Sequence, residues 1–244
     1  MSDIQSADNI PTYYQYSYYY PWQQLLWQQL YNNRAIEQFP HALLFSGVSG
    51  IGKKQFAFYL ARALLCQSPR ENPQTGQLEP CRQNETQILC RSCQLFSVAS
   101  HPDCYHITPP SGKKIIPVDA IRELIQWSVL SSQLGGKKVI IIEPAEAMNI
   151  NAANSLLKTL EEPVADTIII LLSSKKQALP ATIRSRCRPI DIQLPEKQDG
   201  INWLIQQNVP QSELMLSLAC GAPLLALQLS QGKQQEVRHF IIGQ

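Results

Sequence analysis

Three short, unbroken apolar runs stand out along the chain, at 42–45, 139–142 and 168–172. None of them alternates with polar residues, so each predicts a strand buried on both faces, as in a parallel sheet. Two weaker runs, at 105–108 and 189–193, predict a fourth and a fifth strand. Segments of helical period lie between these runs, which favours a doubly wound α/β domain with helices on both faces of the sheet.

Apolar residues at three- and four-residue spacing predict helices over 118–125 and 153–160. The second helix is expected to end at Glu161 and Glu162, because Pro163 cannot continue it. After Pro195 the pattern changes to short helices with no strand among them, at 201–207, 213–219 and 223–229. We therefore expect an α/β domain over residues 1–194 and a small all-helical domain over residues 195–244.

A glycine-rich turn follows the first strand and precedes a helix that is expected to run to about Leu65. It matches the P-loop pattern G-x-x-x-x-G-K-[ST] at all but its last position, through Gly47, Gly50, Gly52 and Lys53. Glycines let backbone N–H groups curl around a phosphate, and the helix N-terminus adds its positive dipole. Lys54 stands where a hydroxyl would coordinate Mg²⁺, and an ammonium group cannot ligate a cation. The alternative is a strand-to-helix turn that holds no ligand.

The end of the strand at 139–142 lacks the acidic pair that an active ATPase site requires. An ATPase of this type needs one carboxylate there for the metal shell and another to activate water. The chain continues as Glu143, Pro144, Ala145, Glu146, so proline takes the position of the water-activating carboxylate. We therefore expect a relic P-loop that does not hydrolyse ATP.

Four of the seven cysteines fall in one segment directly after the P-loop helix: Cys66, Cys81, Cys90 and Cys93. The last two form a C-x-x-C pair, whose spacing lets one chain knuckle present two thiolates to a metal. The polar segment at 67–89 has hardly any core, so a bound metal would hold it together. These features predict a structural Cys₄ zinc site; the alternative is four unrelated thiols with a redox-active C-x-x-C pair. Nearby His101, Cys104 and His106 are expected to be packed or hydrogen-bonded residues.

Three arginines alternate with small residues at Arg184, Arg186 and Arg188. By themselves they fit a solvated face, a phosphate-tracking patch, or a finger that reaches into a neighbour's active site. The intervening Ser185 and Cys187 are expected to pack inward while Arg186 points outward.

Composition and charge exclude some classes of protein. With 44% hydrophobic and 16% charged residues, the chain is neither disordered nor membrane-like in composition. No apolar run approaches the roughly 20 residues that span a bilayer, and no signal peptide is evident. We therefore expect a cytoplasmic protein without membrane contact. A net charge of +2 offers no argument for nucleic-acid binding.

The N-terminal segment is rich in tyrosine, since six of the nine tyrosines lie between Tyr13 and Tyr20. We expect this segment to be a leader that packs on the surface of the fold, rather than an arm that stacks on bases or on a partner.

Several stretches resemble bacterial clamp-loader subunits of the AAA+ family: PHALLF at 40–45, HPD at 101–103, NSLLKTLEEP at 154–163 and SRC at 185–187. The similarity runs from about residue 20 to residue 231. It implies a P-loop NTPase fold with a zinc-binding insertion, followed by a small helical domain. The four cysteines named above would be the zinc ligands, although the spacing from Cys81 to Cys90 is wider than the family's usual C-x-x-C. Lys54 and Pro144 resemble the delta-prime branch, which has lost hydrolysis, rather than the ATP-hydrolysing tau/gamma branch.

The resemblance also implies a function. It is that of a non-catalytic stator in the DNA polymerase III clamp loader, a subunit of a DNA-directed DNA polymerase holoenzyme. Its partners would be the tau/gamma and delta subunits and the sliding clamp, with primed DNA reached through the complex. Arg186 would be an arginine finger that acts in trans on a neighbour's ATP, and Ser173 or Ser174 would match the polar sensor position. The family's C-terminal collar domain is expected to be absent from this chain.

Two other functions compete with this one. The first is an AAA+ ATPase whose atypical P-loop tolerates Lys54. The second is a zinc-containing DNA-binding module that places four cations on phosphates: Lys175, Lys176, Arg184 and Arg188.

Overall fold

The computed structural model describes residues 18–34, 39–73, 76–82 and 88–232. Five strands form one parallel sheet in the order β4-β5-β6-β1-β7. Their bounds are β1 (Ala42–Ser46), β4 (Cys104–Ile107), β5 (Lys138–Ile142), β6 (Thr167–Ser173) and β7 (Arg188–Asp191). All five overlap the predicted runs, with ends that differ by at most two residues, so the predicted parallel α/β sheet is confirmed.

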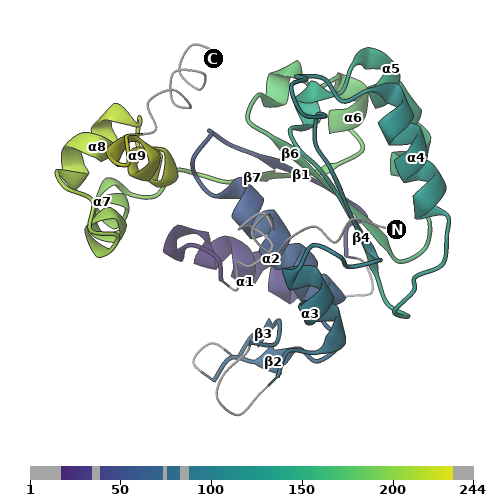
Figure 1. Ribbon diagram of the computed structural model, residues 1–244, viewed down its shortest axis with the longest axis horizontal. Coiled ribbons are helices and arrows are strands. Elements are labelled where there is room, and N and C mark those ends of the chain that lie inside the picture. The colour runs from purple at the N-terminus through teal and green to yellow at the C-terminus, as the bar shows by residue number, and fades with distance from the viewer. Residues whose placement is uncertain (1–17, 35–38, 74–75, 83–87, 233–244) are drawn as a thin grey trace, which may run out of the picture.

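Helices cover both faces of the sheet (Figure 1). One face carries α1 (Gln24–Arg34), α2 (Lys53–Leu65) and α3 (Arg91–Ser97); the other carries α4 (Val118–Ser128), α5 (Ile150–Glu161) and α6 (Ala181–Arg184). Successive residues of a strand point to opposite faces. Leu43 and Phe45 of β1 accordingly belong to the α2 core, whereas Ala42 and Leu44 belong to the α5 core. Burial on both sides explains why β1 is apolar at successive positions.

The helix α5 begins and ends where its sequence requires. The Asn149 side chain accepts a hydrogen bond from the Ala152 N–H at 2.8 Å, which caps the first turn. The helix ends at Glu161, two residues before Pro163. Near that end the His41 Nε2–H donates to the Leu160 carbonyl at 2.9 Å, which ties α5 to the start of β1.

Three short helices follow the sheet: α7 (Lys197–Gln206), α8 (Ser212–Leu218) and α9 (Pro223–Ser230). All three were predicted, and they pack on one another around Leu204, Leu216 and Ala226. Between α2 and α3 the chain forms a two-stranded antiparallel hairpin of β2 (Arg70–Glu71) and β3 (Leu78–Glu79). Short 3₁₀ turns complete the fold as η3 (Pro21–Gln23), η4 (Ala145–Ala147) and η5 (Lys176–Ala178).

The tyrosine-rich segment is described from Tyr18 onward, and Tyr13, Tyr14 and Tyr16 lie outside the described residues. The expectation of a surface leader is wrong for Tyr20, which is only 4% exposed. Its ring stacks on Trp22 and meets Trp203 of α7 edge-on, with ring centroids 4.8 and 5.5 Å away. Aromatic rings bury a large apolar area, and this outweighs the freedom of an exposed arm.

Among the described residues, no single helix combines the length and apolar character needed to cross a membrane. The pair α8 and α9 passes that test only when its two helices are taken together across a bend of 111°.

Candidate functional site

The P-loop turn joins β1 to α2 at the carboxyl edge of the sheet, and other elements close over it. Gly50 and Gly52 have φ angles of +79° and +90°, a conformation that favours glycine. A Cβ atom at Gly52 would lie 2.5 Å from the Tyr20 ring, and one at Gly50 would lie 2.7 Å from the Leu225 Cβ. The Leu224 N–H also donates to the Gly50 carbonyl at 3.0 Å. The helix α9 and the Tyr20 ring therefore both pack directly against the loop.

Lys53, the lysine of the P-loop pattern, is folded back onto its own loop. Its ammonium donates to the carbonyls of Gly47 and Val48 at 2.8 and 2.7 Å. Burial lowers the pKa of Lys53 to about 8, an effect that the carboxylates of Glu146 and Glu143 oppose.

Lys54 forms an ion pair with Glu143 at the end of β5, with 2.7 Å between Nζ and Oε2. The His106 Nε2 lies 3.5 Å from the same carboxylate oxygen. Burial would raise the pKa of Glu143, but the nearby His106 ring and the Lys54 ammonium lower it overall. An ammonium group therefore neutralises the carboxylate at the end of β5.

The end of β6 completes this site. The Ser174 N–H donates to Glu146 Oε1 at 3.0 Å, and the hydroxyls of Ser174 and Ser49 lie 3.2 Å apart. A cavity of about 510 Å³ lies over the loop. Its lining includes both lysines, Glu143, Ser174, Tyr20 and Trp203. The elements of a nucleotide site thus meet at one edge of the sheet, with the two lysines bonded within the chain.

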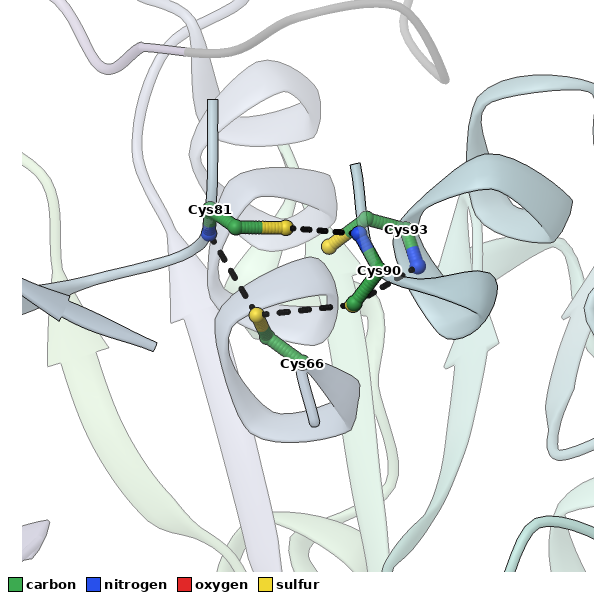
Figure 2. A group of neighbouring side chains, drawn as sticks. All are labelled: Cys66, Cys81, Cys90 and Cys93. Atoms are coloured by element: carbon green, nitrogen blue, oxygen red, sulfur yellow. Dashed lines mark hydrogen bonds between the residues drawn. The ribbon is translucent and has the colours of Figure 1, made fainter. Parts of the chain in front are cut away.

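The four predicted cysteines lie together (Figure 2). Cys66 follows α2, Cys81 follows β3, and Cys90 and Cys93 lie at the start of α3. The four sulfur atoms are all within 4.8 Å of one another, and those of Cys66 and Cys90 are 3.9 Å apart. Zn–S bonds of about 2.3 Å place the sulfurs of a tetrahedral site about 3.8 Å apart. The donor set and its spacing therefore fit a metal ion.

Backbone N–H groups point at the sulfurs of this cluster. The N–H groups of Cys81, Cys90 and Cys93 donate to the sulfurs of Cys66, Cys81 and Cys90 at 3.3, 3.3 and 3.5 Å. Hydrogen bonds from the Cys93 thiol and the Cys81 N–H lower the pKa of Cys66 to about 5, while donation to Cys66 raises the pKa of Cys93. Burial raises the pKa of Cys81 as well. The backbone N–H donors would support thiolate charge, which metal binding requires.

The nearby side chains that competed with the cysteines are engaged elsewhere. His101 Nδ1 accepts from the Asp103 N–H at 3.0 Å, so its Nε2–H donates to the Ser92 hydroxyl at 2.8 Å. Ser92 in turn donates to the Leu65 carbonyl at 2.6 Å. Burial raises the pKa of the Cys104 thiol to about 12. His101, Cys104 and His106 therefore do not belong to the four-cysteine group found among the described residues.

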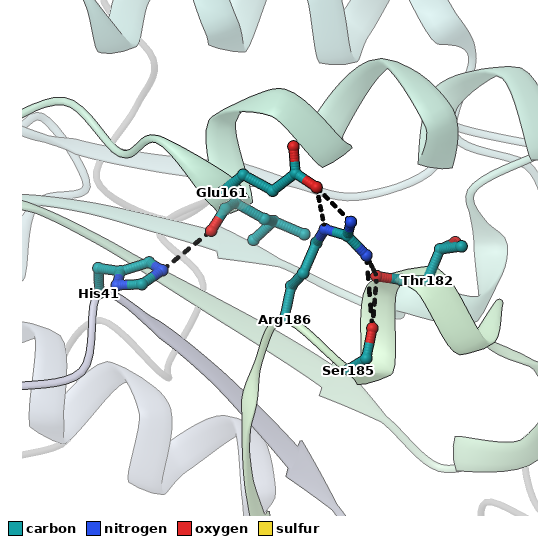
Figure 3. Close-up of polar contacts among 6 residues, drawn as sticks. His41, Glu161, Thr182, Ser185 and Arg186 are labelled. Atoms are coloured by element: carbon teal, nitrogen blue, oxygen red, sulfur yellow. Dashed lines mark hydrogen bonds and ion pairs between the residues drawn. The ribbon is translucent and has the colours of Figure 1, made fainter.

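Arg186 is held within its own chain (Figure 3). Its Nε donates to Glu161 Oε1 at 2.6 Å, its Nη2 donates to the same oxygen, and its Nη1 donates to the Thr182 carbonyl at 2.9 Å. Cys187 is buried as expected, whereas Ser185 is exposed, so the expectation that both pack inward is wrong for Ser185. The reason is that α6 ends in a tight turn, in which the Arg186 N–H bonds to the Ile183 carbonyl and Ser185 faces solvent.

The neighbouring cations differ in their partners. Arg184 donates to the Gln177 side chain at 2.8 Å, and Lys176 pairs with Asp191 at 3.0 Å. Arg188 is exposed on β7. Arg184 and Lys176, two of the cations of the alternative DNA-binding site, are therefore bonded to side chains of this chain.

The sequence did not predict the support that α1 and its preceding turn lend to the P-loop. The Gln23 side chain donates to the carbonyls of Ile51 and Gly52 at 3.2 and 3.0 Å, and the Trp22 indole donates to Ile51 at 3.0 Å. A signal was present, because Pro21 is a typical first residue of a helix.

Comparison with known proteins identifies the family of the chain. Residues 22–196 match the family model described as DNA polymerase III, delta subunit. The chain belongs to this DNA polymerase III delta-subunit family. It is 40% identical over 229 residues to DNA polymerase III subunit delta' of Pseudomonas aeruginosa, covering 92% of this chain and 65% of that protein. It is 34% identical over 226 residues to the same subunit of Escherichia coli, covering 91% of this chain and 64% of that protein. The chain thus spans less than two thirds of the length of these delta' relatives.

Solved structures support the fold of this delta-subunit family member. A DNA polymerase III gamma subunit-related protein from Thermotoga maritima has a TM-score of 0.51 and 19% identity, covering 83% of this chain and 57% of that one. A RuvB variant from Thermotoga maritima also has a TM-score of 0.51, with 13% identity, covering 86% and 59%. At these identities the likeness shows the fold alone, which is the predicted AAA+ P-loop fold.

Proposed function

We propose that this chain acts as a delta-prime-type, non-catalytic subunit of a DNA polymerase III clamp loader. In that role it completes the ring with tau/gamma and delta subunits and helps to place the sliding clamp on primed DNA, which it reaches through the complex. The delta' relatives at 40% and 34% identity support this proposal. Such a subunit works in the cytoplasm and has no membrane partner.

The observation that carries the non-catalytic role is the ion pair between Lys54 and Glu143. Mg²⁺ requires oxygen ligands. Here an ammonium group replaces the hydroxyl ligand, and the same ammonium neutralises the carboxylate at the end of β5. Pro144 supplies no base to orient a water molecule. We infer that ATP is not hydrolysed in this site and that Gly47, Gly50, Gly52 and Lys53 form a relic phosphate loop.

Arg186 is proposed to act in trans on the ATP of an adjoining subunit. Phosphoryl transfer builds negative charge on the γ-phosphate oxygens, and a guanidinium group from a neighbour stabilises that charge. The ion pair with Glu161 is part-exposed, so exchanging its carboxylate for a phosphate costs little. On docking, the guanidinium would exchange its bonds to Glu161 and Thr182 for bonds to the phosphate.

The cysteine cluster is proposed to be a structural zinc site. Zn²⁺ bound by Cys66, Cys81, Cys90 and Cys93 would have four thiolate ligands and no open position for chemistry. These residues join the end of α2, the β2–β3 hairpin and the start of α3, so one ion would crosslink three elements. We also propose that residues 1–194 and 195–244 are the two domains of the chain, joined by the contact of α9 with the P-loop.

The test is reconstitution of the purified chain with ATPase-competent tau/gamma and delta subunits. The chain alone should show no Mg²⁺-dependent ATP turnover, and adding it should raise clamp- and DNA-dependent hydrolysis by the other subunits. Turnover by the chain alone that Lys53→Ala abolishes would favour the atypical ATPase instead. DNA affinity of the isolated chain that falls steeply with salt would favour the DNA-binding module. For the zinc site, the chain should contain one equivalent of Zn²⁺ that Cys90→Ser removes.

A further inference from the structure

Arg62 is a buried cation beside the cysteine cluster. It lies in the last turn of α2 and is only 3% exposed. Removing a guanidinium group from water is costly unless an anion or several acceptors receive it. Its Nη2 donates to the Cys81 carbonyl at 2.9 Å, whereas its Nε is buried and finds no acceptor among the described residues.

The buried carboxylate of the β2–β3 hairpin is bonded to other residues. Glu79 accepts hydrogen bonds from Arg82 at 2.6 Å and from Asn72 at 2.9 Å. The Arg62 guanidinium lies near enough to the Cys93 thiol to interact with it electrostatically. Arg62 thus bonds to the backbone of one cysteine of the cluster and acts by its charge on the sulfur of another.

The cluster has a corresponding need for a donor at Cys93. The sulfurs of Cys66, Cys81 and Cys90 each accept a backbone N–H. The guanidinium group, bonded to the Cys81 carbonyl, brings a full positive charge beside the cluster. Four thiolates around a divalent cation have a net charge of −2, and a neighbouring buried cation reduces it to −1.

We propose that Arg62 is the charge partner of the four-cysteine site and strengthens its binding of a divalent metal ion. The inference rests on the proposed metal site and concerns affinity for a divalent metal ion. The benefit is mutual, because the same charge that stabilises the thiolates is itself stabilised by them. Without negative charge on the sulfurs, Arg62 is left as a buried cation with one carbonyl acceptor.

The experiment compares four forms of the full chain: wild type, Arg62→Lys, Arg62→Gln and Arg82→Met. Lysine keeps the positive charge, glutamine keeps hydrogen-bond donors without the charge, and Arg82 is a half-exposed arginine of the same insertion that pairs with Glu79. Zn²⁺ affinity is measured by competition with a chromogenic chelator. The absorption of Co²⁺-loaded protein reports whether four thiolates still surround the metal.

We expect Arg62→Gln to weaken Zn²⁺ binding by about 10–100-fold, the usual cost of losing a group that supports metal ligands. Arg62→Lys should bind more tightly than Arg62→Gln, and Arg82→Met should match wild type. Circular dichroism at saturating Zn²⁺ shows that each variant is folded when it is compared. Equal affinities of Arg62→Gln and wild type, or a weaker Arg62→Lys than Arg62→Gln, would overturn the role of Arg62. A wild-type chain that binds no Zn²⁺ would overturn the metal site itself.

Discussion

At the scale of single residues, two substitutions change what the P-loop edge can do. Lys54 brings an ammonium group to 2.7 Å from Glu143, and Pro144 follows that carboxylate directly. The ion pair keeps the charge balance that a metal ion would otherwise provide. Within the chain, Lys54 thus neutralises the Glu143 carboxylate.

Lys54→Thr restores the complete pattern G-x-x-x-x-G-K-[ST] and frees Glu143. Nucleotide binding should become Mg²⁺-dependent and tighten about tenfold or more in the presence of the ion, because the threonine hydroxyl and the freed Glu143 carboxylate offer the oxygen ligands that Mg²⁺ takes. Hydrolysis should stay absent because Pro144 is unchanged. Calorimetric titration with and without Mg²⁺ measures the effect, and affinities that do not respond to Mg²⁺ would contradict it.

Glu143→Gln tests the same ion pair through pH. The pKa of Glu143 is lowered in the folded protein, so its contribution is fully present above its ordinary value of 4.5 and is lost as pH falls through the folded value. The variant should be less stable than wild type by about 1 kcal/mol at pH 7. The difference should shrink as pH falls below about 4.5. Urea unfolding at pH 7 and pH 4 provides the comparison; a difference that grows in acid would refute the assignment.

At the scale of elements, the contact between the P-loop and α9 joins the helices after β7 to the sheet. The Leu224 N–H bonds to Gly50, and a Cβ at Gly50 would meet the Leu225 backbone nitrogen at 2.9 Å. Close approach of two backbones is possible here because residue 50 is glycine.

Gly50→Ala should therefore destabilise the chain by more than backbone strain alone. Gly112→Ala is the matched control, because its φ of +75° is close to the +79° of Gly50 but nothing lies within 4 Å of its added Cβ. We expect the free energy of unfolding to fall by about 1 kcal/mol in the control and by about 2–4 kcal/mol in Gly50→Ala. Urea unfolding of both variants measures these losses. Equal losses of stability would show that α9 moves aside for the added methyl group at no cost in free energy.

At the scale of the whole molecule, the edge formed by α5 and α6 presents Arg186. Its three guanidinium nitrogens already have partners from Glu161 and Thr182, and α5 is itself tied to β1 through His41 (Figure 3). The guanidinium is thus placed by the fold before any partner arrives.

Arg186→Ala should leave the chain folded, with a stability change below about 1 kcal/mol, because the ion pair with Glu161 is part-exposed. In a reconstituted clamp loader it should still join its partners but slow ATP hydrolysis at the adjoining subunit. An inserted arginine contributes about 10³–10⁵ in rate at its own site, and the loss seen over a ring with several sites is smaller. Arg184→Ala and Arg188→Ala should do much less. Equal losses of ATP hydrolysis in all three variants would show that the arginines act only through their positive charge and that Arg186 is no specific finger.

The sequence by itself determined the sheet, the P-loop turn and the cysteine cluster. An apolar run such as 168–172 indicates a strand buried on both faces, and a glycine pattern indicates positive backbone angles. The strands and the P-loop turn can therefore be predicted from local sequence. The helix α3 and the β2–β3 hairpin were not predicted, because seven residues and two-residue strands are too short to show a period. What only the tertiary structure decided are pairings between distant residues. The Gln23 side chain bonds to Ile51, Arg62 to Cys81, and Arg186 to Glu161. Such partners are far apart in the sequence and meet only because the elements that carry them pack together. No local sequence pattern shows which distant residues will become neighbours.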